Sequence, residues 1–179
     1  YPSGAFTNIG GDVSYVGTAY TFDTHKIVYE MWSWGSNENK GQLGHNSDNT
    51  NISSPTQIPG STWRGATGGS GNTQVLSVKS DGTLWVWGNN EYGQLGQNNR
   101  TDLSSPVQVP GTTWQRAGVG EGTLSYGIKT DGTLWAWGTN IKGLLGQNQP
   151  QNSHCSSPVQ VPGTTWRSVD SGLNHTITT

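Results

Sequence analysis

The sequence predicts an all-β protein built from stacked four-stranded units, and two recurring motifs indicate this class. One is a pair of tryptophans in the form WxWG, and the other is SSPVQVPGTTW or a close variant of it. The first tryptophans of the pairs are Trp32, Trp85 and Trp135, and the second motif ends at Trp63, Trp114 and Trp166. The repeat is therefore about 51 residues long, with no helical spacing of apolar residues, which is typical of one β-propeller blade.

The middle of each repeat predicts a β-hairpin. β-Branched and aromatic residues flank Asp81-Gly82, and the same pattern surrounds Asp131-Gly132. Asp-Gly between two such runs favours a type I′ turn, which needs positive φ at both central residues. We therefore expect type I′ hairpins in the second and third repeats. The first repeat has the longer segment FDTHKIVYE in this place.

The end of each repeat predicts a short edge strand. Pro106 and Pro110 bracket the strand in the second repeat, and proline cannot donate a main-chain hydrogen bond to a neighbouring strand. The Pro-Gly pair that follows supplies a turn into the next repeat. Each repeat thus contributes about four short strands.

The paired tryptophans are predicted to pack between blades. In a strand, Trp85 and Trp87 point to one face, while Leu84 and Val86 point to the other. Both faces are apolar, as expected for a strand that is buried between two neighbouring units. The alternative is an aromatic array that stacks against a ligand.

The order WxWG, short loop, GQLG, polar loop and SSPVQVPGTTW resembles the repeat of the regulator-of-chromosome-condensation family over nearly the whole chain. The resemblance implies a β-propeller, usually of seven four-stranded blades. In their low content of charged residues, these repeats are similar to those of phage tail, virion and bacterial surface proteins. The chain departs from the family pattern on the inner strand, where only the segment 171–175 approaches the usual Gly-x-x-His.

The chain is predicted to form a single propeller-repeat domain, 1–179. The repeats span about 6–62, 63–113 and 114–165, and a partial fourth spans 166–179. Three blades cannot close a ring, so we expect the chain to be part of a longer propeller. The alternative is self-association, in which two copies complete a propeller of about seven blades.

Composition argues against several classes of function. Charged residues are 11% of the chain, the net charge is -2, and no Lys/Arg block is present. We therefore expect no nucleic-acid partner, because such binding needs a basic stripe. No apolar run is long enough for a membrane span, so we expect no membrane insertion. No catalytic motif, phosphate loop or metal-ligand spacing is present, so we expect no enzyme, no cofactor and no metal.

The candidate binding residues lie where the repeats differ from one another, in the loop between WG and GxLG. Loops on a rigid scaffold commonly carry recognition, although neutral drift of a loop would give the same variation. The candidates are Glu38, Asn39, Lys40, Asn90, Glu91, Tyr92, Asn140, Ile141 and Lys142.

The sequence favours a non-enzymatic structural or recognition module of a virion, phage tail or extracellular assembly. It would bind other subunits of the assembly, or a host-surface protein or glycan, through its blade loops. The expected location is the virion or the cell surface. The alternative is a regulatory propeller that binds a soluble protein partner, as an inhibitor or a guanine-nucleotide exchange factor would.

Overall fold

The computed structural model describes residues 29–37, 40–68, 74–120 and 123–179. Their strands form four antiparallel sheets, two with four strands and two with two strands. The strands are β1 (Met31–Gly35), β2 (Ile52–Ile58), β3 (Trp63–Gly68), β4 (Gln74–Lys79), β5 (Leu84–Gly88), β6 (Leu103–Val109), β7 (Trp114–Val119), β8 (Leu124–Lys129), β9 (Leu134–Gly138), β10 (Cys155–Val161), β11 (Val169–Ser171) and β12 (Thr176–Thr178).

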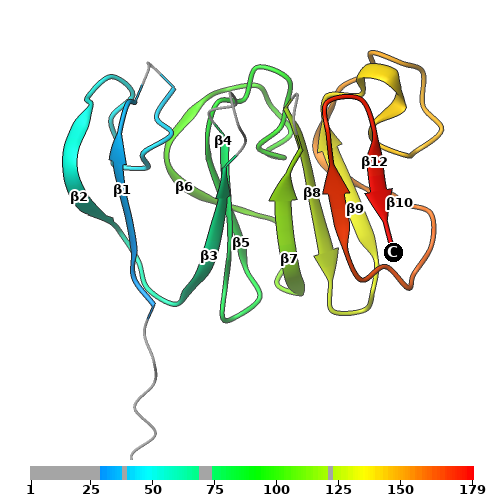
Figure 1. Cartoon of the computed structure of the whole chain (residues 1–179), viewed down its shortest axis with the longest axis horizontal. Helices are drawn as coiled ribbons and strands as arrows, with labels where there is room; N and C mark the ends of the chain where they lie inside the picture. The colour runs from blue at the N-terminus through cyan, green and yellow to red at the C-terminus, as the bar shows by residue number, and fades with distance from the viewer. Residues whose placement is uncertain (1–28, 38–39, 69–73, 121–122) are drawn as a thin grey trace, which may run out of the picture.

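The two complete sheets have the order β3-β4-β5-β6 and β7-β8-β9-β10, so each repeat folds as a meander of neighbouring strands. Figure 1 shows the sheets side by side along the molecule, with β1 and β2 at one end and β11 and β12 at the other. The predicted all-β class with four-stranded propeller blades is confirmed. The first half of the first repeat, 6–28, lies outside the described residues.

The predicted hairpins form, but their turn type is wrong. The amide of Gly82 donates to the carbonyl of Lys79, and the amide of Lys79 donates to the carbonyl of Thr83. Gly82 has φ 80°, whereas Asp81 keeps an ordinary negative φ. This pattern is that of a three-residue loop with a glycine bulge, and not of a type I′ turn. Asp81 stays out of the left-handed region because its carboxylate accepts from the amide and the hydroxyl of Thr83.

The proline-bearing strands lie at the sheet edges, as predicted. Strand β6 pairs only with β5, and its register shifts opposite the interval from Val86 to Gly88. Pro106 falls in this irregular part, where the regular ladder of hydrogen bonds is already interrupted. Its lack of an N–H group therefore costs the sheet no hydrogen bond. The strand therefore tolerates proline without breaking the sheet.

The paired tryptophans pack between blades, as predicted. Trp87 is 1% exposed and belongs to a core cluster that also contains Ile58 of the preceding blade. Trp137 is fully buried and belongs to a core cluster that also contains Leu76 and Leu95 of the preceding blade. Trp34, at the equivalent position in the first repeat, is 60% exposed, since no described blade precedes it.

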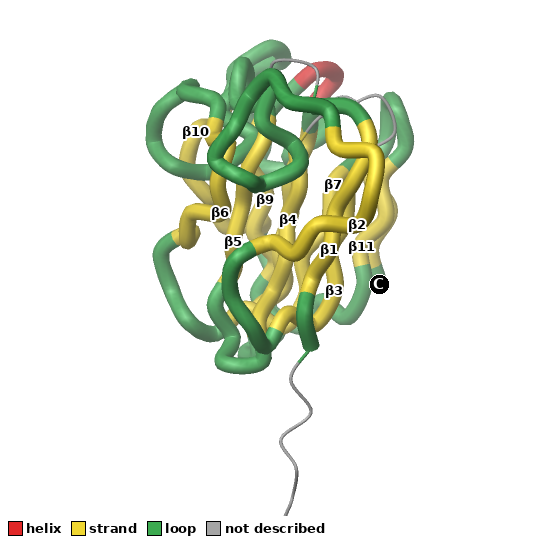
Figure 2. The backbone as a smooth tube through the Cα atoms, turned by 90° about the vertical axis from the view of Figure 1, so that its left-hand side faces the viewer, coloured by secondary structure: helices red, strands yellow, loops and turns green. Residues whose placement is uncertain are grey.

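Successive blades meet through their inner strands and through the loops at one end. Strand β7 of one blade contacts both β3 and β4 of the blade before it. The view from the side in Figure 2 shows the same sheets one behind another. Within the described part of the chain, no helix has the length and the apolar character needed to cross a membrane.

Candidate functional site

The loops that carry the predicted binding residues gather at one end of the blades. They connect β1 to β2, β5 to β6 and β9 to β10, and they lie at the top in Figure 1. The Asp-Gly turns lie at the opposite end, since each hairpin reverses the chain there. The third of these loops contains the 3-10 turn η1 (Ile141–Gly143), in which Lys142 has φ 57°.

Asn90 is fully buried and holds its loop together. Its side-chain carbonyl accepts from the amide of Leu95 at 2.9 Å. Its side-chain NH₂ donates to the carbonyls of Asn99 and Thr101, both at 3.0 Å. Every polar atom of the side chain is therefore used inside the loop.

Asn37 and Asn140 have the same role in the neighbouring repeats. Asn37 accepts from the amide of Leu43, and Asn140 accepts from the amide of Leu145, each at 3.1 Å. Both side chains are at most 1% exposed. Of the candidate residues, Asn90 and Asn140 thus fix the shape of the loops and are buried rather than exposed at the surface.

Lys40 and Tyr92 contact the next blade along the chain. The ammonium of Lys40 lies 3.1 Å from one carboxylate oxygen of Asp102, and the other carboxylate oxygen accepts from the amide of Asn90. The ring of Tyr92 lies 5.1 Å from the ring of His154, edge to face. These contacts tie the three loops into one continuous surface.

The exposed candidates differ in chemistry at matching positions. Glu91 is exposed and Tyr92 is half-buried in one loop, whereas Ile141 is 42% exposed and Lys142 is exposed in the next. Glu38 and Asn39 lie outside the described residues. The same buried asparagine frame therefore presents an acid and a phenol in one blade, and an aliphatic chain and an ammonium in the other.

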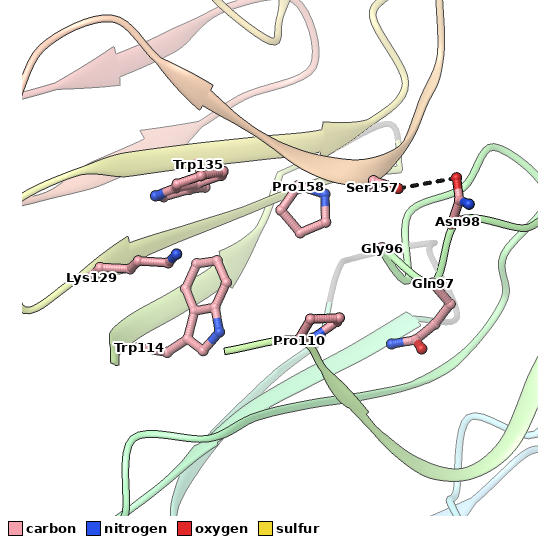
Figure 3. Close-up of a pocket in the computed structure, with 9 residues that line it drawn as sticks. All are labelled: Gly96, Gln97, Asn98, Pro110, Trp114, Lys129, Trp135, Ser157 and Pro158. Carbon is pink, nitrogen blue, oxygen red and sulfur yellow. Dashed lines mark hydrogen bonds between the residues drawn. The ribbon is translucent and has the colours of Figure 1, made fainter. Parts of the chain in front are cut away.

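Two equivalent clefts between the blades were missed by the sequence reasoning. One has a cavity volume of about 330 Å³ and contains Trp114, Lys129, Trp135 and Pro158. Figure 3 shows Lys129 beside the two indole rings, with Pro158 across the cleft from Trp114. The other, of about 500 Å³, has the corresponding residues of the preceding repeat.

A lysine lies between two indole rings in each cleft. The ammonium of Lys79 is 4.2 Å from the ring centre of Trp63 and 4.1 Å from that of Trp85, so both rings stabilise its charge. Desolvation lowers the pKa of Lys79, and the charge of Asp81 opposes this shift. The signal in the sequence is the spacing of lysine and tryptophan in KSDGTLW and KTDGTLW, which begin at Lys79 and Lys129.

Within the described ranges, no group of three histidine, cysteine or acidic side chains could hold a metal ion. Cys155 is a half-buried free thiol, and burial raises its pKa, which lowers its reactivity. The loop end of the blades and the clefts between them are therefore the candidate sites in the described residues.

The chain is similar to several eukaryotic proteins over about half of its length. It is 38% identical to human Protein RCC2 over 82 residues, which cover 45% of this chain and 15% of that protein. It is 32% identical to the human E3 ubiquitin-protein ligase HERC2 over 82 residues, or 45% of this chain and 2% of HERC2. It is 35% identical to the ultraviolet-B receptor UVR8 of Arabidopsis thaliana over 97 residues, or 54% of this chain and 19% of UVR8.

Solved structures match a larger part of the chain. Human WBSCR16 superposes with a TM-score of 0.67 at 25% identity, over 84% of this chain and 39% of that one. Prp20p of Saccharomyces cerevisiae superposes with a TM-score of 0.71 at 17% identity, over 83% of this chain and 39% of that one. Its structure was described together with its binding to Gsp1p and histones, and another structure shows the yeast protein bound by Kap60.

These comparisons overturn two expectations from the sequence. The predicted role in a virion, phage tail or surface assembly is wrong, and so is the predicted location on a virion or cell surface. The relatives are RCC2, a ubiquitin ligase and a plant photoreceptor, and the yeast neighbour is described with Gsp1p, histones and Kap60 as binding partners. The composition misled because low charge and abundant Asn, Ser and Thr describe a neutral surface, and such a surface is compatible with many locations.

The family itself is shown by the repeats. The model of the "Regulator of chromosome condensation (RCC1) repeat" matches residues 30–76, 81–122 and 131–178. Each match contains one WxWG pair, one GxLG loop and the next inner strand, all of which the structure places at equivalent positions. The chain belongs to the family of regulator of chromosome condensation (RCC1) repeat proteins.

Proposed function

We propose that this chain is part of a non-enzymatic regulatory propeller that binds a soluble protein partner at its loop end. The observation that carries the proposal is the contrast within the loops. Their buried asparagines accept the same hydrogen bond from a leucine amide in the three described loops, whereas their exposed side chains differ from one repeat to the next. A fixed frame with variable contacts is what recognition requires.

The relatives support a protein as the partner. The structure of Prp20p was described together with its binding to Gsp1p and histones, and Kap60 is bound to the same yeast protein. The chain spans 15% of human RCC2 and 39% of Prp20p, so the complete propeller is expected to supply further loops to the same surface. Interfaces commonly depend on a few aromatic or large side chains near their centre, and Tyr92 and Ile141 fit that role.

Site-specific photo-crosslinking in the full-length protein tests the proposal. A photoreactive residue replaces Tyr92 or Ile141 in the loops, and Gln108 or Gln160 on the outer strands as matched exposed controls. We expect the photoreactive residue at either loop position to crosslink to the same soluble protein. At the two outer-strand positions we expect no crosslink to that protein. With that protein purified, Tyr92→Ala and Ile141→Ala should each weaken binding by about tenfold, as hot-spot truncations do. Equal crosslinking from all four positions would contradict the proposal.

A further inference from the structure

Three of the four arginines of the chain lie near the start of an inner strand, two within β3 and β7 and one just before β11. Arg64 follows Trp63, Arg116 lies two residues after Trp114, and Arg167 follows Trp166. The fourth, Arg100, is in the loop between β5 and β6. In a chain with a net charge of -2, this is a local concentration of positive charge.

Strands β3 and β7 enclose a groove that contains two of these arginines. Its cavity volume is about 290 Å³, and Arg64, Ala66, Thr67, Arg116 and Ala117 are among the residues around it. None of the described residues that line it is acidic. We call this space the inner groove.

The two guanidinium groups have little internal pairing. Arg64 is exposed, and its one hydrogen bond to a described residue goes to the carbonyl of Ser80 at 3.3 Å. Arg116 is exposed, and its side chain makes no hydrogen bond or ion pair with any residue that the structure describes. The carboxylate of Asp81, in the nearby turn, accepts hydrogen bonds from the amide and the hydroxyl of Thr83 and forms no ion pair with either arginine. The groove therefore holds two charges that no described group neutralises.

The main chain of β3 adds a second feature. Strand β3 is at the edge of its sheet and pairs only with β4, and all its residues after Trp63 are exposed. An edge strand offers unpaired N–H and C=O groups to an extended peptide. The small side chains of Gly65 and Ala66 leave this edge accessible.

We propose that the inner groove binds an extended acidic segment of the partner protein. Arg64 and Arg116 bind carboxylates of that segment, because the planar guanidinium forms paired, charge-assisted hydrogen bonds with them. The free edge of β3 bonds to its main chain. A peptide fits better than a nucleic acid, since no Lys/Arg block is present to follow a row of phosphates. This inference rests on the proposed function that the propeller binds a protein.

Fluorescence anisotropy on the full-length protein tests the inner groove directly. The probe is a labelled twelve-residue peptide of alternating glutamate and serine, and the comparison probes are the same peptide with glutamine and a single-stranded DNA of equal charge. We expect the acidic peptide to bind, the glutamine peptide not to bind, and the affinity to fall with added salt. The double variant Arg64→Gln/Arg116→Gln should lose at least about tenfold in affinity, because two charge-assisted contacts are removed.

The control is Arg100→Gln, which removes the same charge outside the groove and should change affinity by less than about twofold, as an exposed charge does. Circular dichroism and the urea midpoint verify that the variants fold, which is expected because both groove arginines are exposed. An equal loss in Arg100→Gln, or DNA bound as tightly as the peptide and lost with the same two arginines, overturns the inference. If the peptide fails to bind while Tyr92 and Ile141 still crosslink a partner, only this inference is wrong. If neither is observed, both proposals are wrong.

Discussion

Trp137 of β9 donates a hydrogen bond from its indole nitrogen to the main-chain carbonyl of Gln94, in the loop of the preceding blade, at 2.9 Å. Trp87 makes the same bond to the carbonyl of Gln42 one repeat earlier, also at 2.9 Å. At the next boundary, the hydroxyl of Thr176 donates to the carbonyl of Leu144. One carbonyl of each GxLG loop is thus the fixed contact point for the blade that follows.

The first prediction concerns this contact. Trp137→Phe removes the donor and leaves a small cavity in the core between two blades, so the free energy of unfolding should fall by about 2–3 kcal/mol. Ser125 still donates to the carbonyl of Gln94, so the loss should not be larger. Urea unfolding measures the change.

The matched control is Trp135→Phe. Trp135 is half-buried, and its indole bonds within its own hairpin to the hydroxyl of Thr133. Its substitution should cost about 1 kcal/mol, the value of one ordinary hydrogen bond. Equal losses in the two variants would show that the bond between blades contributes nothing of its own.

The second prediction separates backbone strain from the fit between blades. Gly93 has φ 82°, and a Cβ placed there would lie 2.6 Å from the Cα of Ser156. Gly143 has φ 78° at the equivalent position, with nothing within 4 Å of such a Cβ. Gly143→Ala should therefore cost about 1 kcal/mol for strain alone. Gly93→Ala should cost about 1–3 kcal/mol more, because the neighbouring strand must move.

Thermal or urea unfolding of the two variants provides the comparison. Should Gly143→Ala be as destabilising as Gly93→Ala, the steric contact with Ser156 would not be the cause. In a longer protein, a further blade would pack on the third loop as β10 packs on the second. The loss of stability in Gly143→Ala should then rise towards that in Gly93→Ala.

Much of this fold could be predicted because comparison of the three repeats separates constant residues from variable ones. Residues that keep the same spacing fit the same contact at successive boundaries, as Trp87 and Trp137 of the WxWG pairs do. The turn at Asp81-Gly82 was harder, because Asp-Gly occurs in more than one hairpin type. The choice depended on the side chain of Thr83, which bonds to Asp81 and keeps it at negative φ.

The site was less predictable than the fold. Asn90 and Asn140 stood among variable loop residues, yet they recur at a fixed position and are buried, which sequence variation alone does not reveal. Lys79 also recurs at a fixed spacing from Trp85, and its place between two rings depends on Trp63 from the start of the same repeat. Such contacts join residues that are far apart in the chain.

The third prediction tests the buried asparagine frame. Asn90→Asp replaces an NH₂ group that donates to two carbonyls with an oxygen, which brings a buried negative charge against the carbonyls of Asn99 and Thr101. The free energy of unfolding should fall by about 3 kcal/mol or more, as for other buried unpaired charges. Hydrogen exchange at the Leu95 amide should accelerate, because the loop opens locally.

Asn89→Asp is the matched control for the same atom change. The side chain of Asn89 is half-buried and uses its oxygen to accept from Glu91 and Gln94, a role that a carboxylate keeps. This variant should stay within about 0.5 kcal/mol of the wild type, like most changes that break no buried contact. A similar loss in both variants would contradict the assigned role of Asn90.

The fourth prediction concerns stability in acid. Hydrogen bonds from the hydroxyl and the amide of Thr83 lower the pKa of Asp81 in the folded state, and the equivalent bonds from Thr133 lower the pKa of Asp131. A carboxyl whose pKa is lowered by folding stabilises the fold above its unfolded pKa of about 4. That stability is lost as the pH falls through the folded-state pKa. The protein should therefore become less stable below about pH 4.

Asp81→Asn/Asp131→Asn removes both titrations while the amide oxygens can still accept from the two threonines. Stability followed by urea unfolding should then decline less steeply below about pH 4 than in the wild type. Asp48→Asn is the control, since it removes an exposed carboxylate that makes no hydrogen bond with the described residues. If the double variant and the wild type lose stability in parallel, the turn carboxylates are not the groups that link the fold to acid. A flatter curve in the double variant would assign that link to the Asp-Gly turns, which lie at the end of the blades opposite the recognition loops.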